Sequence, residues 1–67
     1  MLYIINTDRT DDKYHETHHH DCAHRPTIQN QEELGSYSSD SVAMLFAKGR
    51  YYDADGCYYC MPTEHHG

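Results

Sequence analysis

The chain has 67 residues, of which 37% are hydrophobic and none is tryptophan. A chain this short forms one domain at most, and its small core usually needs a metal ion or disulfides for stability. The formal net charge of −6 argues against electrostatic binding to nucleic acid or to an anionic membrane, because both need a basic face. We therefore expect a single small domain over residues 1–67, and no membrane contact.

The number of cysteines argues for a metal rather than for disulfides. The three cysteines cannot all pair with one another. Residues 1–5 lack the basic start and the apolar length of a secretory signal, and no stretch is long enough to span a bilayer. Thiols that bind a metal in a reducing compartment fit these features better than an oxidised framework does. The sequence thus predicts a cytoplasmic location.

The first third of the chain predicts a β-hairpin. Residues 2–5 form a β-rich run that is typical of a strand, and residues 7–12 are polar and turn-prone. Residues 13–15 are the candidate returning strand, with a longer loop than the favoured two residues. Further along, residues 33–37 predict a short extended segment with Leu34 facing inward. We expect an N-terminal hairpin or short sheet.

The clearest helix is predicted at about residues 39–48. Ser38 or Ser39 is a suitable N-cap, because its hydroxyl accepts hydrogen bonds from the free amides of the first turn. Gly49 is the expected left-handed stop. Three apolar residues have the spacing of one helix face. They are Val42, Leu45 and Phe46. The fold class predicted is therefore α+β, with one helix.

The C-terminal part contains a Cys-x-x-Cys sequence, formed by Cys57 and Cys60. An Asp-Gly pair at residues 55–56 precedes it and Pro62 follows it. Two thiols at this spacing can reach one ion, as in half of a zinc knuckle. A redox dithiol is the alternative, but it usually places its first cysteine at a helix N-terminus, for which these neighbours leave little room. The pair therefore indicates a metal site.

The remaining ligands are expected near Cys22, the third cysteine. Cys22 as a small buried apolar residue is the alternative. Five of the seven histidines lie at residues 15–24. A tetrahedral site with three cysteines needs one of them. We favour His15, because a strand would hold its ring in a defined direction. The other candidates are His18, His19 and His65. The predicted zinc ligands are thus Cys22, Cys57, Cys60 and His15.

Over residues 13–62 the pattern resembles the Ada-like metal-binding microdomain, a small zinc-binding domain of bacterial proteins. The features that match are Tyr14-His15, Cys22, the Ser-capped helix, the aromatic residues 50–52 and the Cys-x-x-Cys turn. The resemblance implies zinc between a β-hairpin and the helix. The residues that match the family's ligand positions are His15, Cys22, Cys57 and Cys60. The interval from His15 to Cys22 is longer than in compact members, and the methyl-acceptor member has four cysteines, so methyl transfer is not inferred.

These features predict a structural zinc module that is not an enzyme and that serves as an interaction or accessory domain for a protein partner. A histidine-rich buffer or carrier of zinc, nickel or copper is the first alternative, because imidazole suits all three metals. A redox dithiol protein comes next. Catalytic zinc ranks lowest, with Glu64 as the one candidate general base. The sequence specifies neither the partner nor an oligomeric state.

Overall fold

The computed structural model describes residues 1–10 and 12–67. It is a small α+β structure with a four-stranded sheet and one α-helix, so the predicted fold class is confirmed. The strands are β1 (Leu2–Asn6), β2 (His15–His19), β3 (Gln31–Ser36) and β4 (Ala54–Gly56). The helix is α1 (Asp40–Arg50), and short 3-10 turns lie at Ile28–Asn30 and Pro62–Glu64. No helix of the described part is long and apolar enough to cross a membrane.

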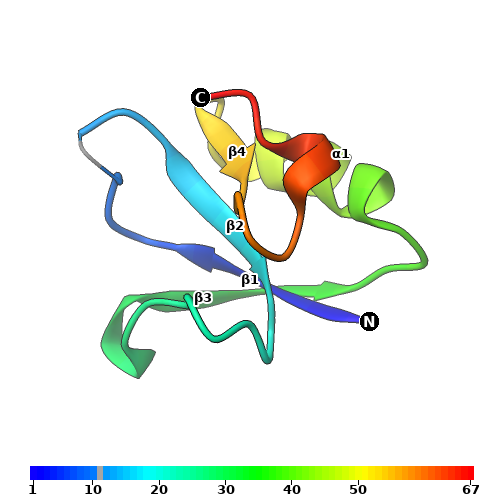
Figure 1. Cartoon of the computed structure of the whole chain (residues 1–67), viewed down its shortest axis with the longest axis horizontal. Helices are drawn as coiled ribbons and strands as arrows, with labels where there is room; N and C mark the ends of the chain where they lie inside the picture. Colours follow the sequence, from blue (N-terminus) through cyan, green and yellow to red (C-terminus); the bar gives the residue numbers. More distant parts are fainter. Residues whose placement is uncertain (11) are drawn as a thin grey trace.

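The sheet has the strand order β3-β1-β2-β4 (Figure 1). The apolar strand β1 pairs antiparallel with both β2 and β3, and three consecutive residues of it are buried, so both faces of the sheet are covered at this strand. Strand β4 runs parallel to β2. The predicted first strand and hairpin are confirmed. The returning strand covers His15–His19 rather than residues 13–15, because Thr17, His18 and His19 are the residues that pair with β1.

Helix α1 begins as predicted and ends later than predicted. The Ser39 hydroxyl accepts a hydrogen bond from the Val42 amide at 3.3 Å. The prediction that Gly49 ends the helix is wrong. The helix continues for one more residue, and the Tyr51 amide still donates to the Ala47 carbonyl at 2.9 Å. Because the backbone ladder runs past Gly49, this residue has no need of a left-handed conformation.

The helix face that packs on the sheet is not the one formed by Val42, Leu45 and Phe46. Leu45 is 72% exposed and Phe46 is 53% exposed. The residues that α1 buries are Ala43, Met44 and Ala47. Two alanines on this face let the helix backbone come close to the strands, which is why the smaller side chains are inside. Phe46 instead stacks on Tyr37, with ring centroids 4.7 Å apart.

The hydrophobic core lies between α1 and one face of the sheet. Its other members are Tyr3 and Ile5 of β1, Leu34 of β3, Ala54 of β4, and Met61. Side chains of a strand alternate between the two faces, so Ile4 and its partner His18 project from the opposite face to Tyr3 and Ile5. This alternation directs His18 away from the helix.

The end of the chain folds back onto β4. The His66 and Gly67 amides both donate hydrogen bonds to the buried carboxylate of Asp55, at 3.0 Å for the closest contact of each. Figure 1 shows this last segment, coloured orange to red, beside β4 and α1. The Cys-x-x-Cys turn thus leaves from β4, and the residues that follow it are hydrogen-bonded back to Asp55 of the same strand.

Candidate metal centre

One histidine and three cysteines converge at the edge of the sheet. His18, Cys22, Cys57 and Cys60 each offer one ligand atom, and these four atoms lie within 4.8 Å of one another. The sulfurs of Cys22 and Cys57 are 3.9 Å apart, although the two residues are separated by 35 positions. All three cysteines are free thiols. Zinc–sulfur bonds of about 2.3 Å in a tetrahedron place two sulfurs about 3.8 Å apart, so this spacing suits one shared ion.

Strands β2 and β4 position the Cys-x-x-Cys turn. The Cys57 amide donates to the Thr17 carbonyl at 2.9 Å, which extends the parallel pairing by one residue beyond β4. The Met61 amide donates to the Cys57 carbonyl at 2.9 Å and closes the turn. The first thiol of the pair is thus fixed against the strand that carries His18.

The loop after β2 brings Cys22 to the same place. The Cys22 amide donates to the His19 carbonyl at 3.0 Å, and the Arg25 amide donates to the Cys22 carbonyl at 3.1 Å. These two bonds form consecutive tight turns directly after the strand. Because of these turns, Cys22 lies close to His18, which precedes it by four residues.

Each of the three sulfurs accepts a hydrogen bond from a backbone amide. The Tyr59 amide donates to Cys57 Sγ at 3.4 Å, the His24 amide to Cys22 Sγ at 3.4 Å, and the His19 amide to Cys60 Sγ at 3.3 Å. Hydrogen bonds to a thiolate favour its charged form and orient its lone pairs. The local backbone is thus arranged for three thiolates.

Without a cation, however, the thiols resist ionisation. Burial raises the pKa of both Cys57 and Cys60, and the charge of a neighbouring thiolate raises each of them further. The amide hydrogen bonds act in the opposite direction but do not outweigh burial. A bound divalent cation reverses this balance, because it is the largest charge in the site and deprotonates a coordinating thiol.

His18 has the properties of an unused ligand. It is 1% exposed, and burial, with smaller contributions from His24 and His19, lowers its pKa to about 4. The ring is therefore neutral at pH 7 and retains a free lone pair. Its Nε2 lies 3.4 Å from Glu16 Oε1, but neither ring nitrogen makes a hydrogen bond within the described part of the chain. An unsatisfied buried nitrogen costs about 1–3 kcal/mol, which coordination of a metal would remove.

His15, the histidine favoured from the sequence, is placed elsewhere. Its Nδ1 lies 2.6 Å from Asp53 Oδ1, and its ring stacks on Tyr51 at 4.0 Å. Two of the other candidates also have different partners. His19 Nε2 lies 2.9 Å from Asp40 Oδ1, and His65 Nδ1 lies 3.0 Å from the Gly56 carbonyl. The structure thus brings together the three predicted cysteines with His18.

The alternation of side chains along β2 explains why His18, and not His15, lies beside the three thiols. In β2, residues 15, 17 and 19 share one face and residues 16 and 18 share the other. A strand predicted to end at residue 15 cannot reveal this pattern. Extending the predicted strand to residue 19 would have separated His18 from its neighbours and directed it to the face that lies away from the helix.

No protein-family model, curated protein or solved structure matches this sequence. The resemblance to the Ada-like microdomain therefore stays a prediction. The cluster of His18 with the three cysteines is compatible with a bound metal ion, and it is the feature on which a function can be argued.

Proposed function

We propose that this protein is a structural zinc-binding module without catalysis of its own. The observation that carries the proposal is the convergence, within 4.8 Å, of three thiols and one buried imidazole that makes no hydrogen bond in the described structure. Four protein ligands complete a tetrahedral zinc shell and leave no open position for water or substrate. Such closed sites are structural, whereas catalytic zinc keeps one position open.

The choice of zinc rests on the donor set. Thiolate and imidazole ligands in a tetrahedral arrangement suit zinc, while carboxylate and carbonyl oxygens suit magnesium or calcium. Structural zinc in small peptides contributes an apparent free energy of about 10–16 kcal/mol near neutral pH. A 67-residue protein with a core on one face of a short sheet has much to gain from such an ion.

The surroundings of the six other histidines favour a module over a metal carrier. A carrier would need further groups of imidazoles that can share an ion. His15, His19 and His65 lie at hydrogen-bonding distance from Asp53, Asp40 and the Gly56 carbonyl. The remaining three, His20, His24 and His66, are exposed, and none of them belongs to a second group of potential ligands among the described residues. One ion per molecule is therefore the expected stoichiometry, and an accessory or interaction role is the function that fits a closed site.

The first test is removal of the metal. We expect the purified, untagged protein to contain about one zinc per molecule, and a strong chelator to abolish its tertiary structure in near-UV CD and amide NMR spectra. Restoring zinc should restore the spectra. A protein that keeps its full NMR dispersion without metal would contradict a structural role, and several ions of similar affinity would favour the carrier.

The second test assigns the histidine. His18→Ala should lose most zinc binding, and His15→Ala should keep one ion per molecule because His15 pairs with Asp53 in the structure. Cobalt substitution gives a direct readout, since its visible absorption reports the number of thiolate ligands and the tetrahedral geometry. If His15→Ala lost the metal and His18→Ala kept it, the ligand set proposed here would be refuted.

A further inference from the structure

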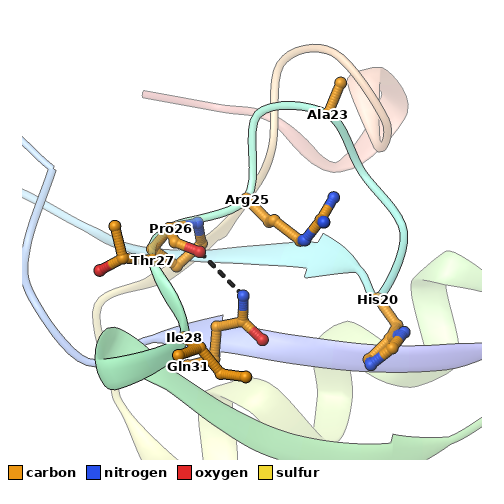
Figure 2. A pocket seen from close by; sticks show the side chains of 7 residues that line it. All are labelled: His20, Ala23, Arg25, Pro26, Thr27, Ile28 and Gln31. Carbon is orange, nitrogen blue, oxygen red and sulfur yellow. Dashed lines mark hydrogen bonds between the residues drawn. The ribbon is translucent and has the colours of Figure 1, made fainter.

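A hollow of about 460 Å³ is lined by residues of the segment that connects β2 to β3 and contains Cys22 (Figure 2). Its lining residues are His20, Ala23, Arg25, Pro26, Thr27, Ile28 and Gln31. Its apolar wall is formed by Ala23, Pro26 and Ile28, and the Ile28 side chain is 79% exposed. Small-molecule sites in proteins combine such apolar walls with a few polar groups.

Arg25 provides an uncompensated positive charge in this hollow. The other two arginines are paired with carboxylates: Arg9 Nε lies 2.8 Å from Asp53 Oδ2, and an Arg50 guanidinium nitrogen lies 2.7 Å from Glu32 Oε2. Arg25 instead donates to the neutral carbonyl of Cys22 at 2.9 Å, and no ion pair of Arg25 is found among the residues that the structure describes. Arg25 is exposed, so its guanidinium is available to pair with an external anion.

Two further polar side chains face the same space. Figure 2 shows the Arg25 side chain extending over the hollow, with the His20 ring on the side toward which it points. Gln31 Nε2 donates to the Pro26 carbonyl at 2.8 Å, which fixes the amide group of Gln31 in the wall. The hollow therefore presents a guanidinium, an imidazole and an amide next to exposed aliphatic carbon.

We propose that this hollow binds a monocarboxylate that carries a short aliphatic group. The carboxylate would accept two hydrogen bonds from the Arg25 fork, and the aliphatic part would cover Ile28 and Pro26. A singly charged anion suits the protein better than a phosphate, because the net charge of −6 repels a higher charge more strongly. Two kinds of ligand carry a carboxylate next to an aliphatic group: a free aliphatic acid, and the C-terminus of a peptide that ends in an aliphatic residue.

The hollow is coupled to the metal centre through Cys22. The sulfur of Cys22 belongs to the cluster, and its carbonyl holds the Arg25 guanidinium. A metal ion that fixes Cys22 would therefore also fix Arg25, so the coupling, unlike the hollow itself, rests on the proposed function. Zinc removal should weaken carboxylate binding.

The test is an amide NMR titration of the protein as isolated, with its zinc content counted first. Hexanoate is the first probe and hexanol is its uncharged control. An acetylated tripeptide ending in Val-Leu with a free carboxylate, compared with its C-terminal amide, is the second pair. We expect both acids to shift the amides of residues 20–31 and the alcohol and the amide to leave them unchanged. A tighter fit of the peptide acid identifies a peptide C-terminus as the source, and a tighter fit of hexanoate identifies a free acid.

Two variants and one control decide whether the hollow is responsible. Arg25→Gln should weaken acid binding by about tenfold, the size expected for loss of a charge-assisted hydrogen bond. Ile28→Ser should weaken it as well, and as a change at an exposed side chain it should leave the fold intact. Lys48→Gln removes the same charge outside the hollow and should change the dissociation constant by less than about twofold.

The inference is overturned if neither acid shifts these amides, or if Arg25→Gln and Lys48→Gln have equal effects. Its failure can be told apart from that of the proposed function. A protein that binds zinc but no acid refutes the hollow alone. A protein that binds acid through Arg25 but contains no zinc refutes the zinc module alone.

Discussion

The ionisation of His18 couples the stability of the folded protein to pH. Burial lowers the pKa of its ring to about 4, whereas a histidine in an unfolded chain titrates near 6.5. Between these two values the unfolded state binds a proton that the folded state does not. The stabilisation is therefore complete above about pH 6.5 and is lost as the pH falls toward 4, by about 3 kcal/mol for this difference in pKa.

We expect the free energy of unfolding of the zinc-loaded protein to fall as the pH drops below about 8.5, the pKa of a thiol in an unfolded chain, and to fall more steeply below about pH 6.5, where His18 adds to the effect. Protonation of the three thiolates acts in the same direction, since thiolates must form before a metal binds. Urea unfolding followed by far-UV CD at a series of pH values measures the effect. His20→Ala is the control, because His20 is exposed and outside the cluster, and it should leave the curve unchanged. Equal stability at about pH 7.5 and about pH 5 would contradict the burial of a neutral His18.

Within the secondary-structure elements, two glycines have opposite roles. Gly35 of β3 has φ = 134°, and a Cβ on it would lie 2.9 Å from the Tyr37 hydroxyl. Gly35→Ala should therefore destabilise the protein by roughly 1–3 kcal/mol.

Gly49 lies inside α1, and a Cβ on it would meet nothing within 4 Å. Gly49→Ala should stabilise the protein by about 0.5–1 kcal/mol, because alanine restricts the unfolded chain and favours a helix. Urea unfolding of the two variants measures both changes, and equal signs would contradict the backbone described here.

The same elements show what local sequence patterns can predict. The start of α1 could be predicted because the Ser39 hydroxyl acts on amides of its own first turn. Strand β4 could not, because distant contacts decide it. Strand β4 has three residues, including an Asp-Gly pair that is typical of a turn, and it exists by pairing in parallel with β2, which lies far away in the sequence. The end of β2 depends likewise on pairing with β1, so the sequence favoured His15, whereas the structure groups His18 with the three thiols.

At the scale of the whole molecule, the cluster of His18 and the three cysteines brings together segments that are far apart in the sequence. Cys22 lies in the loop between β2 and β3, and Cys57 and Cys60 follow β4. The three thiols could be grouped from sequence because the protein offers no others and a metal is the chemistry that uses an odd number of them. The choice of the histidine needed the fold. An ion bound here would tie the loop, the strand β2 and the C-terminal turn into one unit.

The proposed zinc module would make stability a function of free zinc. An ion that binds the folded state and not the unfolded one adds about 1.4 kcal/mol to the free energy of unfolding for each tenfold rise in its free concentration above the dissociation constant. We expect urea midpoints in zinc-buffered solutions to rise linearly with the logarithm of free zinc. Magnesium should have no effect, because sulfur and imidazole ligands do not suit it. Cys22→Ser should flatten the dependence, since Cys22 is the ligand that comes from the loop. A midpoint independent of free zinc would mean that the fold is held by its core alone, and the zinc module proposed here would be rejected.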